Sequence, residues 1–433
     1  MRPLARRDFL GSSLAGLSAF YGATSSAAES VPKAASAVTT IAAAANDPFD
    51  TLFLTWRRDP TTTIMIQWVA PPVPGPAPMI HFADIATDAI WSNAPVITRE
   101  YHPTSPLKVH RCELSGLLPG TEYRFRIGDD PKIHRFRTMP AKATDVFSFI
   151  SGGDCGVNSH VVANNILAAK QNPMFALIGG DLAYDNGHDV KTNLAFLRAY
   201  SQHMIDAAGR HVPMVVAIGN HEVKGGYKAR RTDGPLFFNL HDGLFAERTY
   251  ASLDFGDYLS LVLLDTGHVA PIGGEQTDWL DKALAARTER PHVIAVDHVP
   301  CYPSYRAGDG TDLKPGAGQL NRKHWVPLFE KHNVDLVLEH HDHTFKRTRP
   351  MLDGRFDKNG IVYLGDGSWG KIRPPKPLES RPYLALTDES YHLTLHRLEG
   401  DRRFHLALEE SGRVVDVSMT MKRPKQRMGR SAG

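Results

Sequence analysis

The sequence predicts two folded units in series, a β-sandwich followed by a larger, layered α/β domain. At 433 residues the chain is too long for one ordinary domain. Short apolar–polar alternations dominate up to about residue 140, and continuous apolar runs that end in glycine-rich loops dominate after it. Alternation with period two is typical of strands buried on one face, whereas continuous runs are typical of strands buried on both faces.

Residues 1–46 are predicted to be an export signal and a linker. Adjacent Arg6 and Arg7 precede a mildly apolar run at 14–23, and small residues follow at 25–28. This order is typical of an export signal, and the paired arginines resemble a twin-arginine signal. We therefore expect a periplasmic or extracellular protein with no membrane span in its mature form. A Sec signal or a membrane anchor is the alternative, although the run is short and rich in Gly and Ser for a span.

Residues 47–140 are predicted to form the β-sandwich. Alternating apolar residues mark its strands, with Pro and Gly turns between them: Leu52, Leu54 and Trp56; Ile64, Ile66 and Trp68; Tyr123, Phe125 and Ile127. The stretch 117–123 resembles the turn-and-tyrosine signature of fibronectin type III domains, although a generic hairpin would also fit. This unit carries no catalytic cluster, so we expect it to pack on the second domain and shape the approach to its site.

Residues 141–421 are predicted to form the α/β domain, and residues 422–433 a frayed basic tail. The apolar runs that we interpret as buried strands lie at 146–150, 175–178, 214–218, 259–264, 293–296, 334–338 and 361–364. Candidate helices lie at 161–171, 194–208, 277–288 and 325–332.

Composition excludes some classes of function. A net charge of +3 is too small to indicate nucleic acid as a partner, and no nucleic-acid-binding module is expected. The cysteines are Cys112, Cys155 and Cys301, an odd number without CxxC spacing, which supports neither a disulfide framework nor a thiolate metal site. Cys155 and Cys301 each adjoin a polar loop, so one bridge between them is an alternative to free thiols.

Five of the predicted strands end in short clusters of side chains that can bind metal ions. The clusters are GDCG at 153–156, GDLAY at 180–184, GNHE at 219–222, DH at 297–298 and HHDH at 340–343. A lone Asp or His after a strand is more often a cap. Five such clusters at the carboxyl ends of strands, where α/β sheets place ligand sites, predict one shared site.

The residue types suit two adjacent metal ions. Cations about 3.5 to 4 Å apart repel, and a bridging carboxylate lowers that cost; Asp181 is the candidate bridge. The hard oxygen donors of Asp154, Asp181 and Tyr184, with one imidazole from His343, suit iron(III). A more neutral set suits a divalent ion such as zinc, manganese or iron(II), and it comprises Asn220, His298 and His341 with the shared Asp181.

This series resembles the five metal motifs of purple acid phosphatases, and with the front domain the resemblance extends from about Phe49 to Met419. Tyr184 discriminates within the wider metallophosphoesterases, because other members lack it and place a histidine where Gly156 stands. A core tyrosine bonded to backbone is the alternative for Tyr184.

The resemblance implies an α/β/β/α metallophosphoesterase domain with an iron(III)–divalent centre, coloured by a tyrosinate on the iron. It further implies an acid phosphatase that hydrolyses small-molecule phosphate monoesters through attack by metal-bound hydroxide. Dimers occur in this family, so the chain is compatible with a homodimer.

The resemblance also assigns His221 to the phosphate, for transition-state stabilisation or acid catalysis; a histidine that only orients Asn220 is the alternative. Plant-type members carry further histidines after the fourth motif, whereas 299–306 contains none. Tyr302, Tyr305 and Arg306 are therefore the candidates to bind substrate there, beside Asn220 and His221, unless this loop is simply solvated.

Three questions stay open at this stage. Trp369 is predicted either to line the pocket or to sit in a tight turn. A phosphodiesterase acting on nucleotides or phospholipid head groups would use the same metals with a different rim. A non-catalytic cell-surface binding protein is the alternative from another class, but it would not need the full ligand set.

Overall fold

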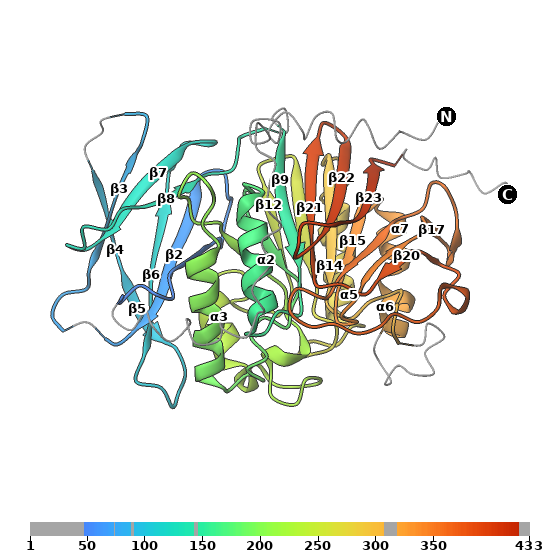
Figure 1. Cartoon of the computed structure of the whole chain (residues 1–433), viewed down its shortest axis with the longest axis horizontal. Helices are drawn as coiled ribbons and strands as arrows, with labels where there is room; N and C mark the ends of the chain where they lie inside the picture. The colour runs from blue at the N-terminus through green and yellow to red at the C-terminus, as the bar shows by residue number, and fades with distance from the viewer. Residues whose placement is uncertain (1–46, 73, 88–90, 143–145, 307–317, 424–433) are drawn as a thin grey trace, which may run out of the picture.

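The computed structural model describes residues 47–72, 74–87, 91–142, 146–306 and 318–423. Figure 1 shows two units side by side, the first sandwich-like and the second built of sheets flanked by helices. The predicted export signal and linker, and all of the basic tail except Lys422 and Arg423, lie outside the described residues.

The N-terminal unit is a pair of four-stranded antiparallel sheets, which confirms the predicted sandwich. One sheet contains, in spatial order, β1 (Phe53–Thr55), β2 (Thr63–Ala70), β6 (Lys108–Ser115) and β5 (Ile97–Glu100). The other contains β4 (Ser92–Pro95), β3 (Met79–Asp84), β7 (Glu122–Ile127) and β8 (His134–Arg137). Buried and partly exposed residues alternate along β7, as period two requires.

A tyrosine closes the turn that precedes β7. The Leu118 backbone N–H donates to the Tyr123 hydroxyl at 2.8 Å. This contact belongs to the tyrosine-corner arrangement of sandwich domains, in which the hydroxyl bonds to backbone a few residues upstream. The turn-and-tyrosine signature read from 117–123 therefore has a structural basis.

The second unit contains two larger sheets. A six-stranded sheet has the order β11 (Met214–Val216), β10 (Ala176–Ile178), β9 (Phe147–Gly152), β21 (His392–Glu399), β22 (Arg402–Glu409) and β23 (Val414–Met421). A seven-stranded sheet has the order β12 (Ala251–Phe255), β13 (Leu259–Leu263), β14 (His292–Asp297), β15 (Leu336–Glu339), β19 (Tyr363–Asp366), β16 (Phe345–Thr348) and β20 (Leu384–Asp388). A small hairpin pairs β17 (Met351–Leu352) with β18 (Arg355–Phe356).

Helices cover the outer faces of the two sheets, which confirms the α/β/β/α layering. The six-stranded sheet is covered by α2 (Ser159–Lys170) and α3 (Val190–His203). The seven-stranded sheet packs with α5 (Glu275–Ala285), α6 (Gly318–His324) and α7 (Val326–Lys331) around a second apolar cluster. Shorter helical segments are α4 (Pro235–His241), η2 (Asn220–Glu222), η3 (Arg231–Asp233) and η4 (Leu378–Ser380).

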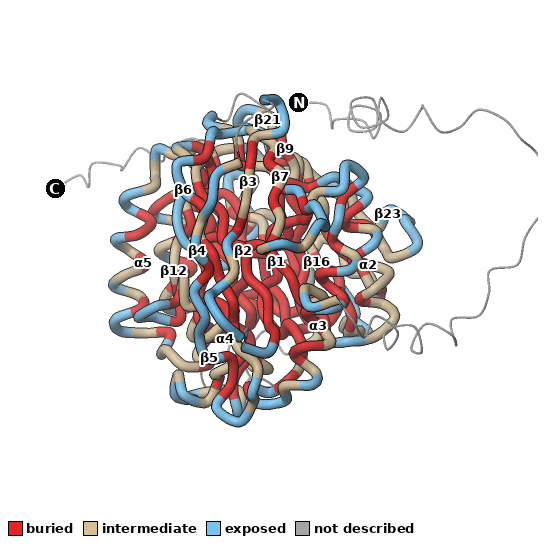
Figure 2. The backbone as a smooth tube through the Cα atoms, turned by 90° about the vertical axis from the view of Figure 1, so that its left-hand side faces the viewer, coloured by how far each residue is buried: buried red, intermediate tan, exposed pale blue. Residues whose placement is uncertain are grey.

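The sandwich packs firmly on the second unit, so β2 is buried on both faces (Figure 2). Trp56 makes edge contacts with the rings of Phe175 and Phe255, at centroid distances of 6.0 and 5.8 Å. The Gln67 amide donates to the Leu240 carbonyl at 2.9 Å, and the Arg111 guanidinium pairs with Asp242. The main apolar core is therefore continuous from one unit to the other.

The structure decides the state of two cysteines and corrects one helix boundary. Cys155 and Cys301 are buried and free, with the Cys301 thiol donating to Asp297 Oδ2 at 3.3 Å, so no bridge joins them. The helix expected at 194–208 ends at His203 and starts earlier, at Val190, because the Asp189 side chain caps the start of α3 by accepting from Thr192 N–H.

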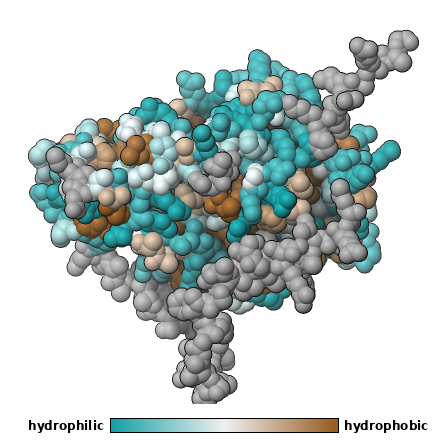
Figure 3. All heavy atoms as spheres, turned by 90° about the horizontal axis from the view of Figure 1, so that it is seen from above, coloured by the Kyte–Doolittle hydropathy of each residue, from teal (hydrophilic) through white to brown (hydrophobic). Residues whose placement is uncertain are grey.

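The surface seen from above is mostly hydrophilic, with hydrophobic residues in separate groups (Figure 3). Within the described ranges, no helix combines the length and apolar character needed to cross a bilayer.

Candidate metal centre

The predicted ligands follow strands whose carboxyl ends share one edge of the domain. In the six-stranded sheet β9, β10 and β11 run parallel, and in the seven-stranded sheet β14 and β15 run parallel. Asp154 follows β9, Asp181 and Tyr184 follow β10, Asn220 follows β11, His298 follows β14, and His341 and His343 follow β15. Side chains from all five strand ends therefore converge between the two sheets.

The backbone at these strand ends is unusual. Positive φ occurs at five predicted ligands, namely Asp154 (56°), Asp181 (55°), Tyr184 (64°), His341 (71°) and His343 (60°). This conformation is uncommon outside glycine, and such residues persist only where the surrounding structure holds them. Their concentration at one place indicates a functional constraint rather than scattered turns.

Glycines beside the ligands allow the loops to touch. A Cβ on Gly219 would overlap the backbone N and Oδ1 of Asp181, and a Cβ on Gly179 would overlap the His340 ring. Close approach of neighbouring atoms therefore requires glycine at these positions.

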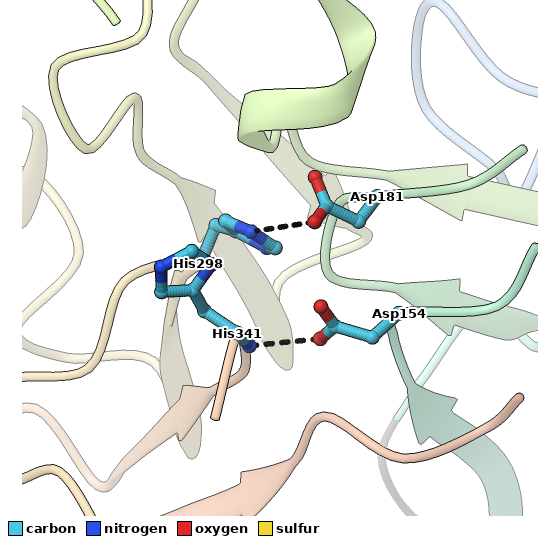
Figure 4. A group of neighbouring side chains, drawn as sticks. All are labelled: Asp154, Asp181, His298 and His341. Carbon is cyan, nitrogen blue, oxygen red and sulfur yellow. Dashed lines mark hydrogen bonds and ion pairs between the residues drawn. The ribbon is translucent and has the colours of Figure 1, made fainter. Parts of the chain in front are cut away.

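Four side chains form the centre of the site: Asp154, Asp181, His298 and His341 each offer a ligand atom within 4.8 Å of the others (Figure 4). His298 Nε2 lies 3.4 Å from Asp181 Oδ2, and the His341 backbone N–H donates to Asp154 Oδ2 at 2.8 Å. All four residues are buried.

The other three predicted ligands join this centre from two sides. On one side, the Tyr184 hydroxyl donates to Asp154 Oδ1 at 3.1 Å and lies 3.0 Å from His343 Nε2. On the other side, Asn220 Oδ1 lies 3.2 Å from His298 Nε2. Tyr184 and His343 therefore lie with Asp154, and Asn220 lies with His298.

The buried carboxylates of the site require positive charge close to them. Burial would lower the pKa of His298, but Asp181 raises it to about 9. Burial would likewise raise the pKa of Asp181, but His298, His221 and His341 hold it below its ordinary value. Buried carboxylates are costly without a cationic partner, and here a protonated imidazole is the substitute.

An unpartnered atom points to the same need. His341 Nδ1 is buried and has no hydrogen-bond partner among the described residues. Such orphaned atoms are rare unless an ion or ligand completes them. Oxygen donors and imidazoles in these numbers fit two metal ions, with Asp181 between them.

His221 lies beside the centre without being part of the cluster of four. Its backbone N–H donates to Asp181 Oδ1 at 2.8 Å, and its Nδ1 donates to Asn186 Oδ1 at 2.6 Å. Its Nε2 therefore faces the site, 3.9 Å from Asp181 Oδ2, and its ring packs on Tyr184 at 4.1 Å between centroids. Burial lowers the pKa of this imidazole, although Asp181 opposes the change.

Two residues that sequence reasoning missed hold the ligands in place. The buried Glu222 carboxylate accepts from the backbone N–H groups of Gly219, Asp181 and Leu182 at 2.6, 2.7 and 2.8 Å. Burial and the nearby Asp181 raise its pKa to about 8. The Tyr227 hydroxyl lies 3.3 Å from His341 Nε2 and fixes that ring. Glu222 stood in the GNHE motif, whereas nothing in the sequence marked Tyr227.

One large cavity of about 1080 Å³ opens over the centre. Its floor includes Asp181, Tyr184, Asn220, His221, His341 and His343. One part of its wall is apolar, with Val269, Ile272 and Leu320, and another carries the cations Lys228, Arg306 and Arg373. None of the described sandwich residues lines it, so the front domain packs on the second unit, as expected, without contributing to this lining.

The remaining predicted residues are placed differently from one another. Arg306 lines the cavity, where its guanidinium pairs with Asp342 and donates to the His341 carbonyl at 3.2 Å. Tyr305 is not among the lining residues; its backbone N–H donates to Asp342 at 2.9 Å. Trp369 is fully buried and donates to Asn165 at 3.0 Å, so it is not a cavity wall.

Comparison with known proteins agrees with this geometry. Residues 50–150 match the family model of the purple acid phosphatase N-terminal domain, and residues 151–345 match that of calcineurin-like phosphoesterases. Purple acid phosphatase 15 of Arabidopsis thaliana is 26% identical over 297 residues, covering 60% of this chain and 53% of the relative. Human acid phosphatase type 7 is 26% identical over 352 residues, covering 72% and 76%.

A solved structure shows the same fold. Purple acid phosphatase PPD1 from yellow lupin seeds matches with a TM-score of 0.69 at 18% identity, covering 85% of this chain and 73% of that one. The chain spans about half the length of the Arabidopsis relative. With both domain models matched in order and the metal motifs converging at one cavity, the chain belongs to the purple acid phosphatase family.

Proposed function

We propose that this protein is a metal-dependent acid phosphatase that hydrolyses phosphate monoesters of small molecules. The observation that carries the proposal is the meeting of seven predicted ligand side chains from five strand ends, and five of these side chains line one cavity. The names of the relatives, acid phosphatases from a plant and from human, support the same activity.

Two metal sites follow from the donor sets. Asp154, Tyr184 and His343 would hold iron(III), and Asn220, His298 and His341 would hold a divalent ion such as zinc, manganese or iron(II), with Asp181 shared. When bound, such a pair supplies a water of lowered pKa and neutralises charge on the phosphoryl group. The pairing of a hard, oxygen-rich set with a more neutral set supports different ions at the two positions.

Two further side chains, His221 and Arg306, would act on the phosphate ester itself. The His221 ring is fixed by Asn186, and its Nε2 faces the site. When the ring is protonated on both nitrogens, its Nε2–H can stabilise the transition state or protonate the leaving oxygen. The Arg306 guanidinium is oriented by Asp342 and presents its remaining N–H groups to the cavity, where phosphoryl oxygens can accept from them.

A rate comparison tests this function. A chromogenic phosphate monoester and the matching diester are assayed from about pH 4 to about pH 9, with His341→Ala as the blank. We expect faster monoester cleavage that is lost in the blank. Faster diester cleavage would instead identify a phosphodiesterase, and no turnover of either substrate with both metals bound would contradict the phosphatase and favour a binding protein.

Spectroscopy tests the iron site without relying on activity. A tyrosinate on iron(III) gives a visible absorption band in this family. Tyr184→Phe should lose the band while keeping the fold, as judged by its circular dichroism spectrum. A band unchanged in this variant would remove Tyr184 from the metal site.

We also propose export by the twin-arginine route to the periplasm or beyond, supported by the Arg6-Arg7 pair ahead of an apolar run. The double variant Arg6→Lys/Arg7→Lys should retain the protein inside the cell in a fractionation experiment. Normal export of that variant would contradict this route.

A further inference from the structure

A short basic segment follows the last strand near the metal centre and has no role in the function so far. Lys371, Arg373 and Lys376 fall within six residues, and no acidic residue occurs before Glu379. Arg373 lines the cavity next to Tyr184 and His343. This segment, 371–376, is called the basic strip below.

Backbone bonds attach the basic strip to the loops around the site. The Arg373 N–H donates to the His343 carbonyl at 2.7 Å, and the Lys376 N–H donates to the Ser304 carbonyl at 3.0 Å. The strip is therefore held against a metal-ligand loop on one side and against the loop that leads to Arg306 on the other. Its position relative to the metal centre is a fixed feature of the fold.

The charged groups of the strip lie over aromatic rings and not beside carboxylates. Lys371 Nζ lies 4.3 Å from the centroid of the Tyr184 ring. The Arg373 guanidinium and Lys376 Nζ lie 5.3 and 5.4 Å from the centroid of Tyr305. Such contacts hold a cation in place while leaving its charge uncompensated.

No carboxylate among the described residues forms an ion pair with these three cations, whereas the neighbouring Arg306 is paired with Asp342. The cavity wall shows the same imbalance, because Asp181 is the one carboxylate among its described lining residues and is itself a candidate metal ligand. Lysine and arginine stay protonated throughout the acid range, so the excess positive charge persists there. Uncompensated charge of one sign in a cleft attracts ligands of the opposite sign.

The cavity is also larger than one phosphate group needs. Its volume of about 1080 Å³ is at the upper end of the range for pockets that enclose whole small molecules. A phosphate on the metal floor therefore leaves room for the remainder of the substrate, with the apolar wall at Ile272 and Leu320 on one side.

We propose that the basic strip is a second anion subsite, and that the preferred substrates are phosphate esters whose alcohol part carries a further phosphate. This inference rests on the proposed phosphatase function and specifies its substrate class. The first phosphate lies on the metal floor, and Arg373, which lines the cavity, binds the second, while the charges of Lys371 and Lys376 add to the attraction.

A matched pair of sugar phosphates tests the subsite in the metal-loaded protein. The value of kcat/KM is measured for glucose 6-phosphate and for glucose 1,6-bisphosphate. The bisphosphate should be preferred by about ten-fold at low salt, which exceeds the factor of about two that its second cleavable group supplies. Raising the ionic strength to about 0.2 M should reduce this preference, because salt screens partly exposed charges.

Arg373→Gln/Lys376→Gln should lower the bisphosphate preference by about five-fold. Lys170→Gln/Arg402→Gln is the matched control, because it removes two charges at exposed positions outside the cavity lining and should keep the wild-type preference. Thermal melts establish that both proteins are folded.

The outcomes separate the two proposals. If neither sugar phosphate nor a chromogenic monoester is hydrolysed, the proposed function fails and the subsite fails with it. If monoesters are hydrolysed but the wild-type bisphosphate preference is at or below two-fold, or is insensitive to salt, the subsite alone is wrong. The wild-type measurements decide this even if the strip variant does not fold.

Discussion

The two units are both built from paired β-sheets, yet they treat left-handed backbone differently. In the described part of the sandwich, positive φ falls only on glycines: Gly75, Gly116, Gly120 and Gly128. In the described part of the second unit it also falls on ten non-glycine residues, five of which are predicted metal ligands. The sandwich thus places this conformation on glycines, which adopt it without strain. The second unit also places it on non-glycine residues, including ligands whose side chains must point into the site.

Clusters of buried ionisable side chains are likewise distributed unequally between the two units. The described residues hold two clusters able to bind a metal ion, and both lie in the second unit. One of them, Asp297, Cys301 and Glu339, already contains a cation, because Lys346 pairs with Glu339. The other, at Asp181, has only imidazoles for positive charge. The cluster at Glu339 is therefore structural, whereas the cluster at Asp181 is the candidate metal centre.

The largest expected effect comes from removing a ligand of the candidate metal centre. Asp181→Asn removes the carboxylate that both metal sets share, so we expect loss of both metals and a fall in kcat/KM of about 10³-fold or more. Elemental analysis of the purified variant and a monoester assay measure the two effects. Asp59→Asn, in the sandwich, is the control. Full metal content in Asp181→Asn would contradict its bridging position.

Gly219→Ala tests whether close packing or backbone conformation makes a glycine necessary. Its added Cβ would overlap Asp181, so we expect a loss of about 2 to 3 kcal/mol in the free energy of unfolding, with reduced metal content. Gly116→Ala in the sandwich meets no neighbour but has φ of 71°, so strain alone should cost about 1 kcal/mol. Denaturant unfolding measures both, and equal losses would refute the distinction.

The junction between the units should weaken in acid. His134 Nδ1 lies 2.9 Å from His211 Nε2, and burial lowers the pKa of His134 to about 4 and that of His211 to about 3. Lys132 lowers both further, while Asp47 and Asp130 partly oppose this at His134. Because these pKa values are depressed, the unfolded chain binds more protons below its pKa of about 6.5, and stability falls as pH decreases.

Between pH 6.5 and pH 5 each histidine should cost about 2 kcal/mol of stability. Denaturant unfolding at both pH values measures this loss in the wild type and in His134→Gln. The variant should lose about 2 kcal/mol less over the interval. Other buried histidines, such as His241, are present in both proteins and cancel in the difference. An identical loss in the two proteins would contradict the role of the pair.

The smallest expected effect concerns Tyr227. Tyr227→Phe removes the contact with His341 Nε2 and should weaken binding of the divalent ion by about ten-fold, since partners of ligating histidines orient them. Competition with a chelator measures the affinity. Phe at 227 keeps the packing on His268, so the melting temperature should barely change. An unchanged affinity would leave Tyr227 as a packing residue alone.

Much of the site could be read from sequence, because each metal cluster is local. Asp154, Asp181 with Tyr184, and His341 with His343 each sit directly after a recognisable strand, and the order of strands along the chain is enough to predict convergence. The parts that could not be read depend on contacts between distant segments. Tyr227 acts on a residue 114 positions away, and β21 enters the sheet beside β9 although the two are far apart in the chain.

By itself, the sequence determined the order of the two units, the strands with their periods of burial, and the residue types of the candidate metal centre, because these are properties of short stretches. Only the tertiary structure decided that Cys155 and Cys301 are free thiols and that Trp369 is buried in the core. It also decided that Arg373 of the basic strip lines the cavity, whereas no described residue of the sandwich does. Those outcomes depend on which distant loops pack together, and the local sequence pattern does not specify that packing.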